Sequence, residues 1–314
     1  MTLPSSGTIS LNQIHVEAGG SSGSTASIND SDIRVLIGKS SGASMSFNEW
    51  YGASREITLP SLTAINGYDN NSNITASEIS GLTAGGTLII PEDFYLWASS
   101  TGAAALIIDL ANITVQNSGF IVGKGGTGNS GAGEAGGDAI SITASGVTIT
   151  NNSGAYIAGG GGAGSQGRNG TPGRGAGGGG QSGTPTLGAA GAAGGSNRPI
   201  DGSGGGAGGG SGAVTFNSGA EGGQGGYIFP GLGGAGGSGG TTAGASGGGG
   251  GNAGSQGIRG GDDAAGALDS GGGGGGWGAG GGADGEGNGG SAGGKGIEAN
   301  SNSFTLTNNG TIYG

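Results

Sequence analysis

Few residues of this sequence have the chemistry for acid–base catalysis. The single histidine, His15, stands near the start of the chain, and three aspartates, Asp262, Asp263 and Asp269, stand close together far from it. Cleavage of a glycan requires two carboxylates at a controlled separation. The three aspartates lie among glycines, whose flexible backbone positions carboxylates poorly, and His15 fits a helix surface. We therefore expect no enzymatic activity.

Three short patterns resemble ligand-binding loops, but each lacks a required feature. Residues 162–167 match the G-x-G-x-x-G dinucleotide pattern without the strand–turn–helix context that it needs. Residues 289–295 have the spacing of a phosphate-binding loop, yet Gly296 replaces the required Ser or Thr. Residues 284–289 resemble the start of a calcium loop, whose twelfth position would be Lys295 instead of Glu. We expect neither a cofactor nor a metal ion.

The composition excludes several classes of protein. Glycine accounts for 91 of 314 residues, whereas about 7% is usual. Cysteine is absent, which excludes disulfides and cysteine metal sites. A net charge of −11 with nine basic residues argues against nucleic-acid binding. No apolar run reaches the length of about 18 residues that a transmembrane helix needs, so we expect no membrane insertion.

The first 54 residues carry signals for short capped helices. The capping residues are Ser10 with Gln13, Ser31 or Asp32, and Ser46 with Glu49. Each helix would be shorter than three turns and unstable alone, so residues 1–54 form either a docking module or a helical cap on the next domain. As a docking module, they would attach through apolar side chains. These are Leu11, Ile14, Phe47, Trp50 and Tyr51.

A β-rich region follows, with turn signals containing Asn. We expect strands over 56–59, 86–90, 94–98, 105–110, 113–115 and 148–150. Residues 112–123, 146–159 and 303–314 repeat one unit: a strand with Thr at alternate positions, an Asn turn, a Gly and a short second strand. The unit fits a hairpin or one rung of a stacked β structure. Because this unit brackets the glycine-rich part, we expect one β platform made of 55–157 and 297–314.

Most of the glycines lie in a tract over residues 158–296, which has too few large apolar side chains for an ordinary core. Within separate runs, such as 231–240 and 251–260, glycine occupies every third position. Polyproline II helices have this period of about three residues, and their backbone groups must find partners outside the helix. We expect a bundle of polyglycine II helices, with a disordered linker as the alternative. Collagen is excluded, because only seven prolines are present.

Segments of different composition interrupt the glycine runs at 181–187, 196–201, 213–230, 241–246, 262–270 and 284–288. Between rigid rods these segments would be loops, and loops on a rigid scaffold commonly form binding surfaces. The binding candidates are aromatic or charged. They are Arg198, Phe216, Glu221, Tyr227, Phe229, Asp262, Asp263, Asp269 and Trp277. For Tyr227, Phe229 and Trp277 the alternative is that they shield the bundle from water.

Two stretches of this sequence resemble proteins of tailed bacteriophages. Residues 6–14 together with 46–52 resemble an N-terminal module of phage tail proteins. The repeated Thr and Asn units followed by polyglycine, within 112–314, are similar to those of phage tail-fibre adhesins. In that family a polyglycine II bundle presents hypervariable loops that bind a receptor on the bacterial surface. The resemblance implies a mainly β and irregular chain in the virion tail, with a small helical module, a β platform and a glycine bundle.

The resemblance also implies two partners. Residues 1–54 would bind a phage tail or fibre protein, and the loops would bind a bacterial surface protein or glycan; the chain would be a homotrimer or a single copy on a trimeric fibre. A structural tail or capsid fibre component without receptor contact is the second hypothesis. The third is ice binding, since small polyglycine II bundles occur among antifreeze proteins. The bulky Arg198, Tyr227 and Phe229 argue against the flat face that ice binding requires.

Overall fold

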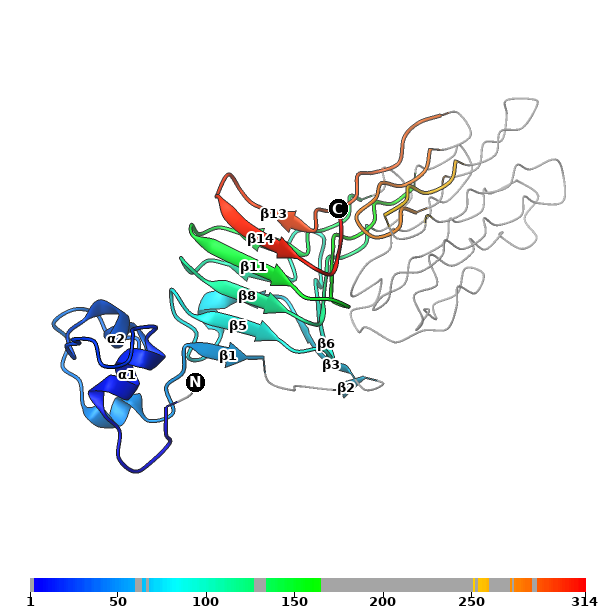
Figure 1. Ribbon diagram of the computed structural model, residues 1–314. Helices are drawn as coiled ribbons and strands as arrows, with labels where there is room; N and C mark the ends of the chain where they lie inside the picture. Colours follow the sequence, from blue (N-terminus) through cyan, green and yellow to red (C-terminus); the bar gives the residue numbers. More distant parts are fainter. Residues whose placement is uncertain are drawn as a thin grey trace, which may run out of the picture.

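The structure is a computed structural model that describes residues 3–59, 64–65, 68–126, 134–164, 251, 254–259, 272, 274–283 and 287–314. In these residues the chain is strand and irregular backbone, with two short α-helices close to its start (Figure 1). The prediction of a mainly β and irregular chain with a small N-terminal helical module is therefore confirmed. Within the same residues, no helix has the length and apolar character needed to cross a membrane.

The helical module begins with α1 (Leu11–Glu17), whose predicted capping box is present. The Ser10 hydroxyl accepts a bond from the Gln13 amide at 3.2 Å, and the Gln13 side chain accepts one from the Ser10 amide at 2.8 Å. These bonds satisfy donors at the helix start that have no partner within the helix. The helix can therefore start at this point although it is only seven residues long.

The other two helices of the module differ from the prediction in detail. The second, α2 (Ser31–Val35), has Asp30 at its N-cap position without a side-chain cap bond, so both residues predicted as its cap lie inside the helix. The third element, η1 (Phe47–Trp50), is a 3-10 helix, and the Glu49 carboxylate accepts a bond from the Ser46 amide at 2.9 Å, as predicted. A further 3-10 turn, η2 (Ala76–Glu78), lies outside the module.

Three sheets form the next part of the chain. The first sheet has the order β1 (Glu56–Thr58), β5 (Thr87–Ile90), β8 (Thr114–Asn117), β11 (Val147–Asn151), β14 (Phe304–Asn308). The second has the order β13 (Ile297–Glu298), β10 (Ile140–Ile142), β7 (Leu106–Ile108), β4 (Ile74–Thr75). The third has the order β15 (Thr311–Tyr313), β12 (Tyr156–Ala158), β9 (Phe120–Val122), β6 (Phe94–Trp97), β3 (Tyr68–Ser72), β2 (Ala64–Ile65).

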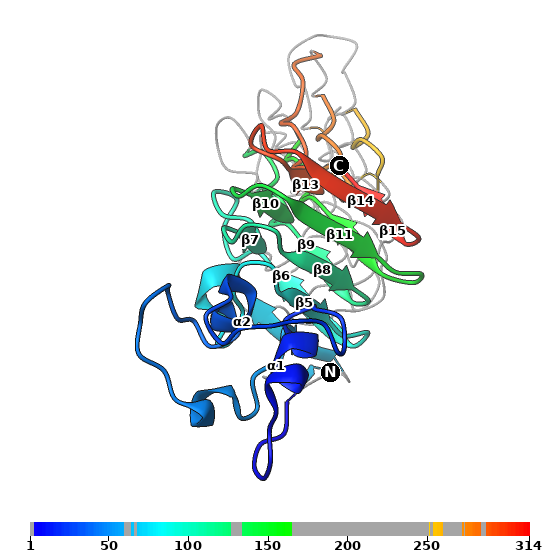
Figure 2. The same cartoon turned by 60° about the vertical axis from the view of Figure 1, so that its left-hand side comes forward.

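The chain visits these sheets repeatedly in one order, which makes a β-solenoid. From β4 to β15 it passes through the second, first and third sheets four times, and each pass is one rung (Figure 2). Neighbouring rungs pair in parallel, with Ile149 opposite both Val115 and Leu306, and Tyr156 opposite both Phe120 and Thr311. The repeated sequence unit therefore forms two of the three strands of a rung and not a hairpin.

The solenoid encloses one apolar core. Along β11 the side chains alternate between buried and half-buried, so Val147 and Ile149 point inward. In the last rung the equivalent side chains are less covered, because no further rung lies beyond them: Phe304 is half-buried and Leu306 is 40% exposed. This stacking explains why strands of only two to five residues suffice, since each strand inside a sheet is supported by a neighbour on either side.

The glycine tract leaves the solenoid at one corner, between the third and second sheets. A shorter excursion, residues 123–139, joins β9 to β10 there, and residues 159–296 join β12 to β13 at the same corner one rung later. The described parts of both excursions lie side by side beyond this corner, whereas the helical module lies beside the start of the solenoid (Figures 1 and 2).

Candidate functional site

Backbone hydrogen bonds join neighbouring glycine segments at intervals of three residues. Gly123 donates to Ala158 at 2.7 Å, and three residues later Gly126 donates to Gly161 at 2.8 Å. Two segments deeper in the tract show the same interval. Their pairs are Gly251 to Gly274 at 2.9 Å, Gly254 to Trp277 at 2.9 Å and Gly257 to Gly280 at 3.1 Å. The backbone groups of one segment are thus satisfied by the next one.

Close approach between these segments requires glycine. A side-chain carbon added at Gly160 would overlap the Lys124 carbonyl, and one added at Gly294 would overlap the Gly137 carbonyl. The same residues make the bonds that hold the segments together, since Gly160 donates to Gly137 at 2.8 Å and Gly294 donates to Gly160 at 2.7 Å. Here backbone packing replaces the side-chain packing of an ordinary core.

Aromatic side chains gather where the tract meets the third sheet. The Tyr156 ring stacks on Phe120, with centroids 5.4 Å apart, and on Tyr313, with centroids 6.4 Å apart. The Trp277 ring meets Tyr156 and Tyr313 nearly edge-on, at 6.3 Å and 6.1 Å. We call these four residues the aromatic cluster. Trp277 belongs to the tract, whereas the other three come from successive rungs, so the cluster joins the two parts of the chain.

Phe120, Tyr156 and Tyr313 are not among the residues predicted from the sequence. A signal was present for the first two, since they occupy equivalent positions in the first and second copies of the repeat, directly opposite each other in the sheet. In the third copy the equivalent position is Thr311, and the aromatic residue stands two positions later. Alternation along the strand keeps both positions on one face of the sheet.

Of the binding candidates in the tract, the structure describes Trp277. It is 1% exposed and packed in the aromatic cluster, so its ring is not on a surface. This burial favours the shielding role that was the alternative for Trp277, and we remove it from the surface candidates. The remaining ones lie outside the described residues: Arg198, Phe216, Glu221, Tyr227, Phe229, Asp262, Asp263 and Asp269.

The attachment candidates divide between the core and the surface of the helical module. Ile14 and Trp50 are fully buried, and the Trp50 indole donates to the Ile33 carbonyl at 3.1 Å. These two residues hold the module together and offer no surface to a partner. Leu11 and Tyr51 are half-buried, and the Tyr51 hydroxyl donates to the Gly7 carbonyl. Phe47 is 43% exposed and is the candidate best placed for contact with a partner.

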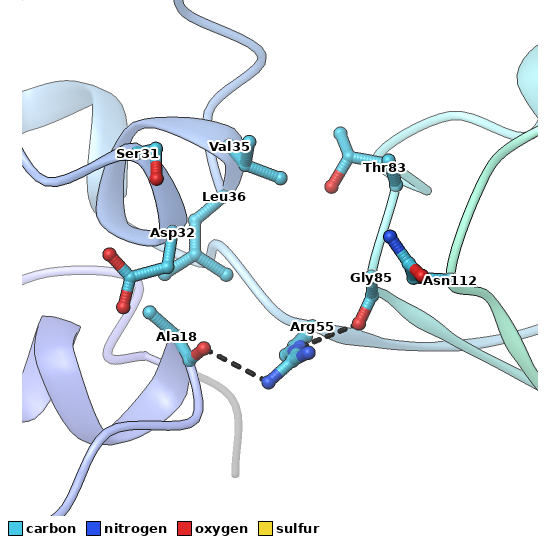
Figure 3. A pocket seen from close by; sticks show the side chains of 10 residues that line it. Ala18, Ser31, Asp32, Val35, Leu36, Arg55, Thr83, Gly85 and Asn112 are labelled. Atoms are coloured by element: carbon cyan, nitrogen blue, oxygen red, sulfur yellow. Dashed lines mark hydrogen bonds between the residues drawn. The ribbon is translucent and has the colours of Figure 1, made fainter. Parts of the chain in front are cut away.

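A polar joint connects the module to the solenoid, which sequence reasoning missed. The Arg55 guanidinium donates to the Ala18 carbonyl at 2.9 Å and to the Gly85 carbonyl at 2.7 Å. The buried Glu17 carboxylate accepts a bond from the Arg55 amide at 3.0 Å. A cavity of about 340 Å³ lies beside this joint, between α2 and the loops that include Thr83 and Gly85 (Figure 3). No sequence motif signals Arg55, because its partners are carbonyls brought together by folding.

Ion pairs with lysine lower the pKa of two carboxyl groups, those of Glu49 and Glu298. Lys39 lies 2.9 Å from Glu49, and this side-chain hydrogen bond, followed by the one from the Ser46 amide, lowers the pKa of Glu49. Lys295 pairs in the same way with Glu298 and lowers the pKa of that carboxyl. Among the residues that the structure describes, no group of His, Asp and Glu is arranged to hold a metal ion. These charged groups therefore fix local structure.

Comparison with known proteins gives one match. The family model described as phage tail fibre adhesin Gp38 matches residues 55–228. The match begins where the helical module ends and continues through β1–β12 into the glycine tract. No curated protein and no solved structure matches the chain. Because the family match spans more than half of the sequence, the chain belongs to the phage tail fibre adhesin Gp38 family and is a component of the virion tail.

Proposed function

We propose that the chain binds a receptor on the bacterial surface through the loops of its glycine tract. The observation that carries this proposal is the geometry of the tract exit. All described glycine segments extend beyond one corner of the solenoid, away from the helical module (Figure 1). An adhesin needs a face for the particle and another for the host, and this arrangement separates them. Binding would use shape and hydrogen bonds, since a chain of net charge −11 is not attracted to an anionic cell surface.

The scaffold for these loops would be a polyglycine II bundle over residues 158–296. The hydrogen bonds at intervals of three residues and the close approach of glycine backbones support this proposal, because a polyproline II helix has that period. A rigid bundle would hold the loops in a fixed arrangement, which lowers the entropy cost of binding. The receptor-binding side chains would be drawn from Arg198, Phe216, Glu221, Tyr227, Phe229, Asp262, Asp263 and Asp269.

Residues 1–54 would attach the chain to a phage tail or fibre protein. The module has its own apolar core, and Phe47 stands exposed on it. The chain would attach as a homotrimer or as one copy on a trimeric fibre, and mass measurement of the complex distinguishes the two. The family points to binding and not to catalysis. The sequence likewise led us to expect no active site.

Adsorption competition tests the proposal. Purified full-length protein is added to host cells, and free phage are counted after infection with the parent phage. We expect saturating protein to reduce adsorption, and we expect replacement of residues 213–230 by a short glycine turn to abolish this effect. Ser301→Gly serves as the control, since Ser301 is exposed in a turn of the solenoid and its φ of 66° suits glycine. If folded wild-type protein neither binds cells nor slows adsorption, the receptor-binding proposal is wrong and a purely structural role in the tail is favoured.

A further inference from the structure

We propose that Trp277 is a positioning residue for receptor binding: it fixes the glycine tract on the third sheet, and with it the orientation of the loops. This inference rests on the proposed function of the tract. It concerns a residue that does not itself touch the receptor.

The aromatic cluster gives Trp277 a built site on the solenoid. Phe120, Tyr156 and Tyr313 come from β9, β12 and β15, three successive strands of the third sheet. Their rings are nearly parallel, at 8° for Phe120–Tyr156 and 6° for Tyr156–Tyr313. The Trp277 ring stands at 74° to Tyr156 and 69° to Tyr313, which is the edge-to-face arrangement that aromatic rings favour.

A tight turn aims Trp277 at this site. Ala279 donates a backbone bond to Gly276 at 3.0 Å, which closes a four-residue turn with Trp277 at its second position. Gly278, at the third position, has φ +65°, as a type II turn requires. An added side-chain carbon at Gly278 would also overlap the backbone of Tyr313 and Gly314. The turn and the cluster therefore specify the same placement of the indole.

Backbone bonds around Trp277 tie separate parts of the chain together. Gly278 donates to Gly159 at 2.7 Å, Gly159 donates to Tyr313 at 2.9 Å, and Gly254 donates to Trp277 at 2.9 Å. Four parts of the chain thus meet around Trp277. They are the start of the tract after β12, the last strand of the solenoid (β15), and the two later tract segments that contain Gly254 and Trp277. An anchor at this point therefore joins the start of the tract, at Gly159, to the later segments that contain Gly254 and Trp277.

In the part of the tract that the structure describes, few other large side chains can hold it on the solenoid. Within its described residues, Trp277 is the one buried aromatic side chain, and the large apolar Ile258 is 62% exposed. Burial of large aromatic area is an effective way to fix one surface on another. Without the indole, the tract would retain its backbone bonds but lose this contact, and binding would have to order the loops as well.

The test compares Trp277→Ala and Trp277→Phe with Ile258→Ala in the full-length protein. Hydrogen exchange followed by mass spectrometry reports on residues 251–283 and, separately, on the β8 and β11 strands. We expect Trp277→Ala to raise exchange in 251–283 at least tenfold with the strands unchanged, and Trp277→Phe to have a smaller effect. Ile258→Ala should leave exchange as in the wild type. Equal effects of Trp277→Ala and Ile258→Ala, or none from either, would refute the anchor.

Adsorption competition then tests the consequence for binding. We expect the concentration of Trp277→Ala that halves adsorption to rise about tenfold or more, and Trp277→Phe to restore most of the loss. Reduced competition with unchanged exchange would make Trp277 a contact residue and overturn the positioning role. If wild-type protein does not compete at all, the receptor-binding function fails, whereas the exchange result still decides whether Trp277 anchors the tract. If Trp277→Ala does not fold, the comparison of Trp277→Phe with Ile258→Ala decides both whether Trp277 anchors the tract and whether this anchor affects adsorption.

Discussion

The side-chain amide of Asn151 donates a hydrogen bond at 2.9 Å to the side-chain carbonyl of Asn308, 157 positions later in the chain. The two residues lie opposite each other in β11 and β14. Asn117, one rung earlier, donates to Asn151 at 2.9 Å, so the three form an asparagine ladder. Through this ladder the end of the chain, beyond the whole glycine tract, completes the solenoid.

Asn151→Ala should destabilise the solenoid substantially. Asn151 is fully buried, and its side chain also donates to the Thr311 carbonyl at 3.2 Å. Its loss leaves buried polar groups without partners, at a cost of about 1–3 kcal/mol. Asn309→Ala is the matched control, since Asn309 directly follows Asn308 and is exposed. Urea unfolding followed by circular dichroism measures both, and similar stabilities of the two variants would contradict the ladder's role.

Ile149→Ala and Leu306→Ala should differ strongly although the two residues face each other in one sheet. Ile149 is fully buried, so its truncation leaves a cavity and should cost about 2–5 kcal/mol. Leu306 is 40% exposed in the last rung, and its truncation should cost under about 1 kcal/mol. The free energies of unfolding in urea give the comparison. A large loss from Leu306→Ala would show that another chain or segment covers the last rung in solution.

Gly160→Ala should weaken the base of the glycine tract. The added methyl would overlap the Lys124 carbonyl, and such overpacking typically lowers the free energy of unfolding by about 1–3 kcal/mol. Gly289→Ala is the control within the tract, because nothing lies within 4 Å of the position of its added carbon. Thermal melting and hydrogen exchange at residues 134–138 report the effect. Equal behaviour of both variants would argue against backbone packing as the source of cohesion.

Phe47→Ser should reduce incorporation of the protein into phage particles with only a small fall in its melting temperature. Phe47 is 43% exposed on the module, and its ring contacts Trp50 at 5.8 Å between centroids, so its removal takes apolar surface from a partner at a small cost to the fold. Leu306→Ser is a control of similar exposure on the solenoid and should leave incorporation unchanged. Quantitative blotting of purified particles measures both. Full incorporation of Phe47→Ser would remove this residue from the proposed attachment surface.

High pH should loosen the aromatic cluster through Tyr313. Burial raises the pKa of Tyr313 above its ordinary value of 10.0, with Tyr156 as a smaller cause. The folded state thus favours the protonated phenol, and this stability is complete below the unfolded pKa and is lost as the pH rises through the folded pKa. The melting temperature of the wild type should therefore fall relative to Tyr313→Phe above about pH 10. A constant difference from about pH 8 to pH 11 would contradict this.

The sequence predicted the local features of this fold well. The capping boxes at Ser10 and Ser46, the strand-forming stretches and the repeated unit follow from residue types at short spacing, which act on nearby backbone. The cap of α2 was assigned wrongly, because Asp30, Ser31 and Asp32 are all suitable cap residues and residue type alone does not distinguish them. Ile14 and Trp50 were predicted as attachment residues but lie in the core of the module, since an apolar residue serves equally in a core or on a docking surface until burial is known.

By itself, the sequence determined that a tract so rich in glycine cannot build an ordinary side-chain core, and that similar β units flank it. The tertiary structure decided that these units are stacked rungs and that the tract leaves from one corner. It also brought Trp277 against Tyr156 and Tyr313, and Arg55 between Ala18 and Gly85. These contacts join residues that are far apart in the chain, so they depend on the parallel register of the rungs, which no local spacing encodes.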